Sequence, residues 1–223
     1  MTADKQKQAA AIAALRFVAN DTVIGVGTGS TVNYFIQALG ESDIRIKGAV
    51  ASSARTETLL KQYGITVYDM NSVSDLSVYI DGADEVDPEF IMIKGGGGAL
   101  TREKIVASAS KKYVCIIDAS KQVERLGCFP LPIEVIPMAR ELVTRTLSAM
   151  GGQVTWREGT ITDNGNLILD VTNLDLSDPE QMEMKLNSIP GVVECGIFAI
   201  HRASCLVVGT ANGVNVIDQP IRP

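Results

Sequence analysis

A glycine-rich stretch, Gly25–Thr31, has residue types that suit a phosphate group, and it lies between a short β-branched run and a helical pattern. Glycine lets the backbone approach a ligand, and the start of a helix offers N–H groups and the positive end of its dipole. Hydroxyl groups at three positions add further hydrogen-bonding capacity. We therefore predict a phosphate-binding loop made of Thr28, Gly29, Ser30 and Thr31. The alternative is a glycine-rich turn that binds no ligand.

The spacing of these glycines argues against two nucleotide-binding loops. In the pattern G-x-G-x-x-G, the third glycine would fall at Ser30 when counted from Gly25, or at Val32 when counted from Gly27. No Gly-Lys-Ser/Thr sequence follows, which excludes the loop of nucleoside triphosphatases. A dinucleotide-dependent dehydrogenase is disfavoured for the same reason.

Three acids follow the strand-like run Val78–Ile80, within the segment Asp81-Gly-Ala-Asp-Glu85. Ligands of open α/β sheets bind beyond the carboxyl ends of the strands, where catalytic carboxylates are therefore expected. We interpret Asp81 and Asp84 as candidate catalytic acids. A solvated turn and a Mg²⁺ site are the alternatives.

Four consecutive glycines, Gly95–Gly98, stand between Lys94 and a helical pattern that carries Glu103. Such a run loses much conformational entropy on folding, and it persists where the backbone must lie against a ligand. A lysine and a carboxylate that flank one backbone cradle could face a single substrate. A flexible connection next to a surface acid is the alternative.

Two lysines are candidates for neutralising a phosphate. Lys121 follows the buried run Tyr113–Ile117 and should lie at the carboxyl edge of the sheet, although it could also be a surface residue. Lys7, in the N-terminal helical pattern, is a second possible phosphate partner.

Helical and strand-like patterns alternate over the first 121 residues, which predicts βαβ units and a largely parallel sheet. The predicted helices cover residues 5–18, 30–39, 54–63 and 99–110, and the predicted strands cover residues 22–26, 46–50, 65–68, 78–80, 91–93 and 113–117.

The pattern changes after a proline-rich crossing at residues 129–137, and residues 131–195 read β-α-β-β-α-β, the split βαβ arrangement. The predicted helices are 139–150 and 179–186, and three of the strands are 154–156, 167–171 and 192–195. The segment Asp163–Asn166 is a hairpin signal, because Asn-Gly accepts positive φ. Two further strands follow, and we expect at least one to return to the first domain. We predict a first domain of residues 1–126 plus about 203–223, and a second of residues 127–202.

Composition narrows the functional classes. The 223 residues carry a net charge of -6 without a basic stretch, which argues against nucleic acid or a membrane surface as a partner. The N-terminus is polar, so no export is indicated, and no apolar run is long enough to span a membrane. Four cysteines without C-x-x-C spacing are typical of reduced thiols in a cytoplasmic protein. His201 is the single histidine, so a zinc site with two or three histidines is impossible.

Taken together, the motifs resemble the type A ribose-5-phosphate isomerase family. The matching segments, in family order, are Val26–Thr31, Asp81–Glu85, Lys94–Gly97, Leu100–Lys104, Asp118–Lys121, Phe129–Val135, Thr162–Asn166 and Ile189–Val192. Each motif alone is weak, but eight in order are specific and cover nearly the whole chain, apart from the residues after Ile217.

The resemblance implies an α/β fold in which a Rossmann-like core carries a smaller α+β, ferredoxin-like domain. It implies a homodimer or higher assembly without a cofactor or metal, which interconverts D-ribose 5-phosphate and D-ribulose 5-phosphate in the non-oxidative pentose phosphate pathway. Glu103 would be the proton acceptor. The implied substrate-binding residues are Thr28, Gly29, Ser30, Thr31, Asp81, Gly82, Ala83, Asp84, Lys94, Gly95, Gly96, Gly97 and Lys121.

The residues are compatible with that chemistry, because aldose–ketose isomerisation needs a base and an electrophile for the enediolate oxygen. Glu103 can supply the base and Lys94 the electrophile. Asp81 and Asp84 can hold the sugar hydroxyls, and the sequence leaves open which aspartate takes which role. The rival functions are a sugar-phosphate-sensing regulator and an acyl-CoA transferase that uses Glu103 as a nucleophile.

Overall fold

In the computed structural model, which describes residues 1–219, the chain separates into two compact units. Residues 1–83, 102–122 and those from 203 on form the first unit, and residues 84–101 and 123–202 form the second. Residues 84–101 and 123–126, which we expected in the first domain, thus pack in the second unit. Residues 220–223 of the expected C-terminal segment lie outside the described residues.

The first unit contains a six-stranded sheet in the order β13-β12-β6-β3-β1-β2. Five strands are parallel, and β13 pairs antiparallel with β12, so the largely parallel sheet is confirmed. The return of β12 from the end of the chain to this sheet is also confirmed. The strands are β1 (Val23–Val26), β2 (Gly48–Ala51), β3 (Tyr79–Asp81), β6 (Tyr113–Asp118), β12 (Cys205–Thr210) and β13 (Gly213–Asp218).

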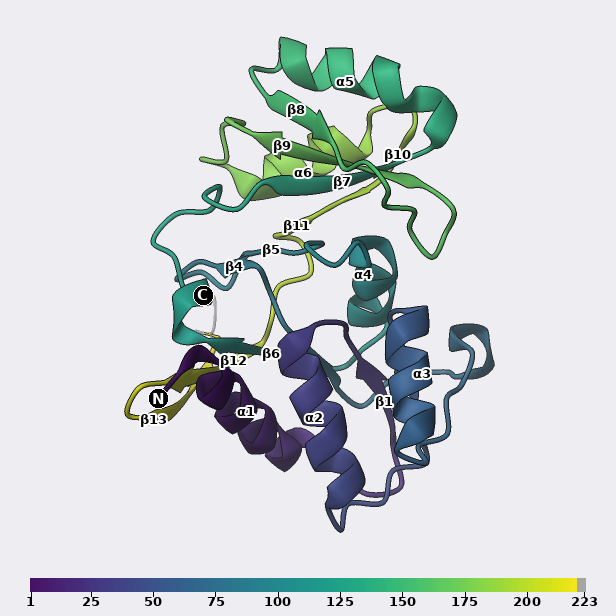
Figure 1. Cartoon of the computed structure of the whole chain (residues 1–223), viewed down its shortest axis with the longest axis vertical. Helices are drawn as coiled ribbons and strands as arrows, with labels where there is room; N and C mark the ends of the chain where they lie inside the picture. The colour runs from purple at the N-terminus through teal and green to yellow at the C-terminus, as the bar shows by residue number, and fades with distance from the viewer. Residues whose placement is uncertain (220–223) are drawn as a thin grey trace. The chain divides into compact units, whose positions relative to one another are not determined.

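Apolar side chains of the helices join those of the parallel strands in one core, and Figure 1 shows α1 and α2 next to each other in this unit. The long helices are α1 (Ala3–Ala14), α2 (Ser30–Glu41), α3 (Ala54–Gln62) and α4 (Leu100–Ser108), and the 3-10 turns are η1 (Leu15–Phe17), η2 (Met70–Ser72) and η3 (Ala119–Lys121). Helix α4 begins in the second unit at Leu100 and Thr101 and continues in the first from Arg102.

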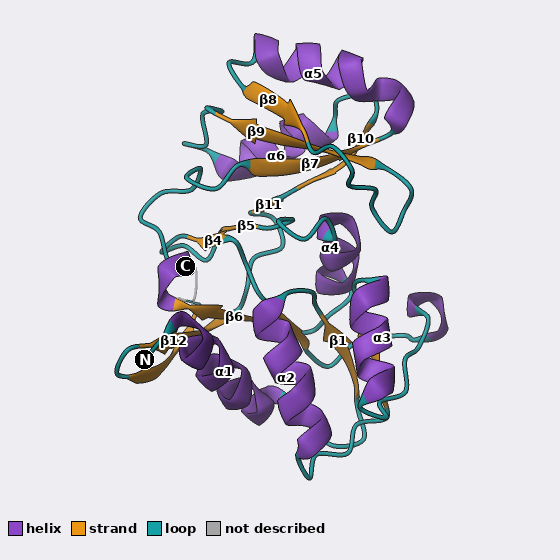
Figure 2. Ribbon diagram, in the orientation of Figure 1, coloured by secondary structure: helices purple, strands orange, loops and turns teal. Residues whose placement is uncertain are grey.

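The second unit contains a four-stranded antiparallel sheet in the order β10-β7-β9-β8, shown in orange in Figure 2 with its helices in purple. The elements are β7 (Leu131–Val135), η4 (Pro137–Ala139), α5 (Arg140–Ala149), β8 (Gln153–Trp156), β9 (Leu167–Thr172), α6 (Pro179–Asn187) and β10 (Val192–Cys195). This β-α-β-β-α-β order confirms the predicted split βαβ arrangement. Gly165 has a φ of 81° in the predicted turn.

A three-stranded antiparallel sheet, β11-β5-β4, completes the second unit. Its strands are β4 (Glu85–Val86), β5 (Met92–Ile93) and β11 (Ile197–Phe198). Ile93 pairs with Glu85 on one side and with Ile197 on the other, which explains why residues 84–101 belong to this unit. Lys94 follows β5 directly.

The sequence-based assignments differ from the structure in several places, and strands β4 and β13 were not predicted. The run at residues 65–68 makes a single bridge, between Val67 and Ala49, instead of a strand. Helix α2 continues through Gly40 to Glu41, because burial of its apolar face outweighs the low helix propensity of one glycine. No helix within residues 1–219 is long and apolar enough to cross a membrane.

Glu85, the third acid of the acidic segment, has a structural role. Its buried carboxylate accepts the N–H groups of Gly127 at 2.8 Å and Phe129 at 2.5 Å, and so fixes the crossing that leads into β7. Both bonds are charge-assisted, because the acceptor is a carboxylate.

We predict that Glu85→Gln lowers the free energy of unfolding by about 1–3 kcal/mol. The side-chain NH₂ of glutamine would face one of the two backbone N–H groups that the carboxylate accepts, and that N–H would lose its acceptor. Glu124→Gln, at an exposed position of the same crossing, is the matched control and should leave stability unchanged. Urea denaturation followed by circular dichroism measures both variants. Equal midpoints for the two would contradict the anchoring role.

Candidate active site

The carboxylate of Asp81 lies at the end of β3 and joins this strand to the Thr28 loop of the first unit. One oxygen, Oδ1, accepts the N–H of Thr28 at 3.0 Å and of Gly82 at 2.7 Å. The other, Oδ2, accepts the hydroxyl of Tyr79 at 2.5 Å. Asp81 is fully buried, so these bonds offset the desolvation of its charge. They also tie the Thr28 loop to the neighbouring strand.

The three glycines around this loop are required for different reasons. A Cβ on Gly27 would lie 1.9 Å from the Asp81 carboxyl carbon, so Gly27 makes room for the carboxylate. A Cβ on Gly25 would lie 2.5 Å from Val106 Cγ1, so Gly25 lets α4 approach β1. Gly29 has a φ of 137° with open space beside it, and it begins α2 without a side-chain cap. Of the three, Gly29 is therefore the one with open space where a Cβ would stand.

A cluster of hydroxyl groups that sequence analysis missed holds the side chain of Thr28. Its Oγ1 lies 2.8 Å from the hydroxyls of both Ser52 and Ser53 and 3.2 Å from that of Thr56, in the segment from β2 into α3. Thr56 donates in turn to the Gly27 carbonyl at 2.7 Å. The loop is thus fixed by side chain as well as by backbone, while Ser30 and Gly29 are exposed.

Glu103 is buried in the first turn of α4, the helix that packs on β1 at Gly25. Its charge is close enough to affect Tyr79. The pKa of Tyr79 is raised well above its usual value, first because the phenol is buried and then because the charges of Asp81 and Glu103 disfavour a phenolate. Tyr79 therefore stays a neutral donor to Asp81. Two of the predicted carboxylates, Asp81 and Glu103, act on this tyrosine.

The two candidate lysines come from neighbouring segments. Lys121 ends η3, where the Asp118 carboxylate caps the turn by accepting the Ser120 N–H at 3.0 Å. The Gln6 side chain accepts the Ala119 N–H of the same turn at 3.4 Å, so α1 meets the turn one residue before Lys7. Lys7 also pairs with Asp4 at 3.8 Å.

In the second unit, Asp84 and the glycine run form a separate group. The Asp84 carboxylate accepts the Gly96 N–H at 2.7 Å, and a Cβ on Gly96 would lie 2.6 Å from that carboxylate. Gly95 and Gly98 adopt φ values of 105° and 77° and close a turn by a 2.9 Å hydrogen bond from the Gly98 N–H to the Gly95 carbonyl. The run is therefore a defined turn, with Gly96 and Gly97 exposed.

Lys94 is buried at the end of β5. Its backbone N–H donates to the Gly196 carbonyl at 2.9 Å, and its Nζ lies 5.4 Å from the centre of the Phe198 ring, a cation–π distance. Phe198 was missed by sequence analysis. Pairing of β5 with β11 places it there.

Two further charged residues of the second unit, both missed as contributors to the site, hold this segment at its two ends. Arg157 donates to the carbonyls of Gly95 and Gly96. Glu134, which is fully buried, accepts the hydroxyl of Thr101 in the first turn of α4. The remaining donors to Glu134 are Thr162, Asn164 and Asn166. Glu134 thus connects two of the sequence motifs to the start of the helix that carries Glu103.

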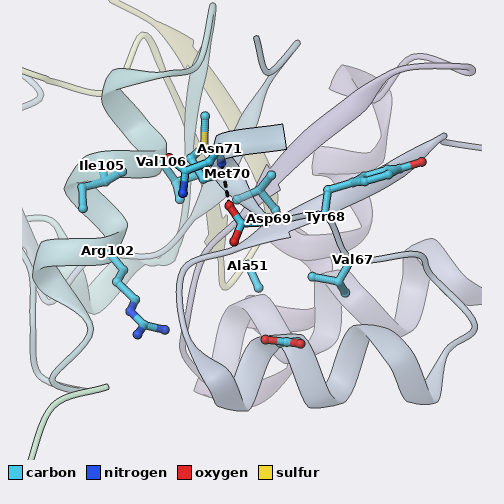
Figure 3. Close-up of a pocket in the computed structure, with 11 residues that line it drawn as sticks. Ala51, Val67, Tyr68, Asp69, Met70, Asn71, Arg102, Ile105 and Val106 are labelled. Atoms are coloured by element: carbon cyan, nitrogen blue, oxygen red, sulfur yellow. Dashed lines mark hydrogen bonds between the residues drawn. The ribbon is translucent and has the colours of Figure 1, made fainter. Parts of the chain in front are cut away.

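The predicted acids are not grouped as a metal site within residues 1–219, where no three His, Cys, Asp or Glu side chains gather as ligands. A hollow of about 430 Å³ lies beside α4 in the first unit (Figure 3). Arg102, Ile105 and Val106 line it together with Tyr68–Asn71, and no predicted site residue does.

Comparisons with known proteins identify the family. Residues 48–213 match the family described as Ribose 5-phosphate isomerase A (phosphoriboisomerase A). The ribose-5-phosphate isomerase A of Actinobacillus succinogenes is 56% identical over 214 residues, 96% of this chain and 98% of the relative.

Solved structures agree with this assignment. The crystal structure of ribose 5-phosphate isomerase A from Neisseria gonorrhoeae is 54% identical, with a TM-score of 0.97 and 98% of each chain covered. A D-ribose-5-phosphate isomerase in complex with phospho-erythronic acid is 40% identical, with a TM-score of 0.93, covering 98% of this chain and 100% of that one. The chain therefore belongs to the ribose 5-phosphate isomerase A family.

Proposed function

We propose that this enzyme moves a proton through an enediolate, with Glu103 as the base. The reaction interconverts D-ribose 5-phosphate and D-ribulose 5-phosphate, an intramolecular redox step of the pentose phosphate pathway. Family membership supports the reaction, and so does the relative that binds phospho-erythronic acid, whose planar carboxylate resembles an enediolate. The observation that carries the mechanism is the buried carboxylate of Glu103 on the helix that directly follows the glycine run.

In the forward direction, Glu103 removes the proton from C2 of the open-chain aldose, and negative charge develops on O1. Return of the proton to C1, with transfer of the O2 hydroxyl proton to O1, gives the ketose. Lys94 supplies a cation for the developing oxyanion, and the N–H groups of the glycine run supply fixed dipoles. The buried position of Lys94 supports this role, because a charge acts more strongly away from water.

The two aspartates are proposed to differ in their roles. Asp84 is partly exposed, which suits contact with a sugar hydroxyl and assistance in ring opening. Asp81 is fully buried and accepts three hydrogen bonds, so we assign it the task of holding the Thr28 loop and Gly82 in place. Gly82 and Ala83 would then offer backbone groups to the substrate.

The phosphate is proposed to bind at the start of α2, at Thr28–Thr31, with Lys121 and Lys7 as cationic partners. The glycine cap of α2 carries no side chain, so the first-turn N–H groups have no side-chain cap. The contact of Gln6 with the Lys121 turn supports a joint role for the two lysines.

The mechanism needs no cofactor or metal, because base, cation and N–H donors all come from the chain. We further propose a homodimer in the cytoplasm, with the sugar phosphate as its partner and no role for nucleic acid or membrane. The family resemblance suggests the dimer. Within residues 1–219 no two cysteines form a disulfide, which is compatible with a reducing compartment.

We predict that Glu103→Gln lowers kcat by about 10²–10⁴-fold and leaves binding of a sugar-phosphate inhibitor nearly unchanged, because the amide keeps shape but cannot accept the proton. Steady-state kinetics and calorimetric titration with phospho-erythronic acid measure the two effects. Near-normal turnover would remove Glu103 from the mechanism.

Isomerisation in D₂O after exhaustive chelation should proceed at full rate and place deuterium at C1 of ribulose 5-phosphate. Proton transfer by a carboxylate exposes the hydrogen to exchange with solvent, whereas a metal-bridged hydride shift does not. Proton NMR of the product reads the outcome. Lost activity that Mg²⁺ or Mn²⁺ restores, without deuterium incorporation, would overturn the enediolate path.

The raised pKa of Tyr79 predicts a pH dependence of stability. The folded state holds the phenolic proton more tightly than the unfolded state, so this stabilisation is complete below about pH 10 and is lost as pH rises through the native pKa. When the pH rises from about 10 to about 11, the wild type loses the stabilisation by Tyr79 and the Tyr79→Phe variant has none to lose. The decrease in the free energy of unfolding should therefore be about 1 kcal/mol smaller in Tyr79→Phe than in the wild type. Tyr63→Phe, at a partly exposed tyrosine, is the control and should follow the wild type. Urea denaturation at both pH values tests this, and parallel slopes in all three proteins would refute it.

A further inference from the structure

Arg157 follows β8 and binds two consecutive carbonyls of the glycine run. Its Nη1 donates to the Gly95 oxygen at 3.0 Å and to the Gly96 oxygen at 3.1 Å. On its other edge, Nε donates to Asp170 Oδ2 at 2.8 Å, and Nη2 donates to Asp170 Oδ1. A bidentate carboxylate holds a planar guanidinium in a fixed orientation, and about a fifth of each side chain is exposed.

These contacts determine where the N–H groups of the run point. In a planar trans peptide the carbonyl and the N–H point in opposite directions. Because Arg157 holds the carbonyls of Gly95 and Gly96, the N–H groups of Gly96 and Gly97 face away from it. The Gly96 N–H does so and meets Asp84 at 2.7 Å. The Gly97 N–H has no partner among residues 1–219, and Gly97 is exposed.

We propose that Arg157 is a positioning residue, which orients the Gly97 amide for the negatively charged oxygen that develops in the reaction. The inference rests on the proposed enediolate path. A positive charge on both carbonyls polarises the amides further and makes their N–H groups stronger donors.

The alternative, a structural brace, is weaker because the turn has its own closure. The Gly98 N–H donates to the Gly95 carbonyl at 2.9 Å, so the turn keeps that bond when Arg157 is removed. The Gly96 carbonyl then loses its partner, and the peptide between Gly96 and Gly97 becomes free to rotate. Glycine lacks a Cβ to restrict that rotation.

The test compares Arg157→Ala with Arg140→Ala, which removes a guanidinium 4.4 Å from the Trp156 ring, one residue before Arg157. For Arg157→Ala we expect kcat to fall by about 10–10³-fold with KM changed by less than about 3-fold, since the lost interaction acts on the transition state. Arg140→Ala should keep both constants.

Two inhibitors separate positioning from general damage. Binding of phospho-erythronic acid, which carries a carboxylate, should weaken in Arg157→Ala in parallel with kcat/KM, whereas binding of ribitol 5-phosphate, a polyol without that charge, should not. Methylguanidine in the assay should restore part of kcat to Arg157→Ala and none to Glu103→Gln. Equal weakening of both inhibitors, or an unchanged kcat, would overturn the assignment.

Two further variants keep the proposal testable if Arg157→Ala does not fold. Arg157→Lys retains a cation but not the planar fork, and Asp170→Asn loosens the guanidinium. Both should give smaller losses with the same inhibitor selectivity, and losses without that selectivity would contradict the proposal. Deuterium incorporation by the wild type reports on the enediolate separately, so a failure here with exchange intact overturns the role of Arg157 alone.

Discussion

The buried carboxylate of Asp81 constrains much of the first unit. A charge without contact to solvent must accept several hydrogen bonds, and Asp81 receives them from Tyr79, Thr28 and Gly82. The room for this carboxylate exists because residue 27 is glycine. The need to satisfy this carboxylate therefore explains why residue 27, in the loop after β1, is a glycine and why Tyr79 stays protonated. It also explains the position of the Thr28 backbone at the carboxyl edge of the sheet.

The glycines of the chain serve unlike purposes although they look alike in sequence. Gly25 admits a helix, Gly27 admits a carboxylate, Gly29 leaves a helix start uncovered, and Gly96 admits Asp84. Sequence analysis assigned close approach of a ligand to the whole stretch, whereas a Cβ on Gly25 or Gly27 would meet other side chains of the protein. The atoms that a Cβ would meet lie far away along the chain, so their identity could not be inferred from local spacing.

Most elements were predictable because they have a regular hydrophobic period and a turn residue near their end, although β4 and β13 were missed. The split βαβ unit and the parallel sheet follow from that order. What could not be predicted are contacts between distant side chains, such as Thr28 with Ser52 and Arg157 with Gly95, which leave no local pattern. Glu134 offered a signal that was not used: a carboxylate within an apolar strand must be buried with partners. Four neutral side chains, three from the Thr162–Asn166 motif and one from α4, are those partners.

An isomerase that stabilises an oxyanion needs donors that are fixed before the substrate arrives and yet are not consumed by other partners. Backbone amides meet both conditions when they are held by their carbonyls, because the carbonyl and the N–H of a planar peptide point in opposite directions, so holding the carbonyl fixes the N–H without occupying it. The second unit does this at the glycine run, where Arg157 binds the carbonyl side and the Gly97 N–H stays available. At the start of α2 the same division holds, since the Gly29 carbonyl accepts the Asn33 N–H while the glycine cap leaves the first N–H groups without a side-chain acceptor. In both places the structure restrains the carbonyl side of a glycine peptide and leaves the N–H side without a side-chain acceptor, which is the arrangement that the proposed mechanism needs.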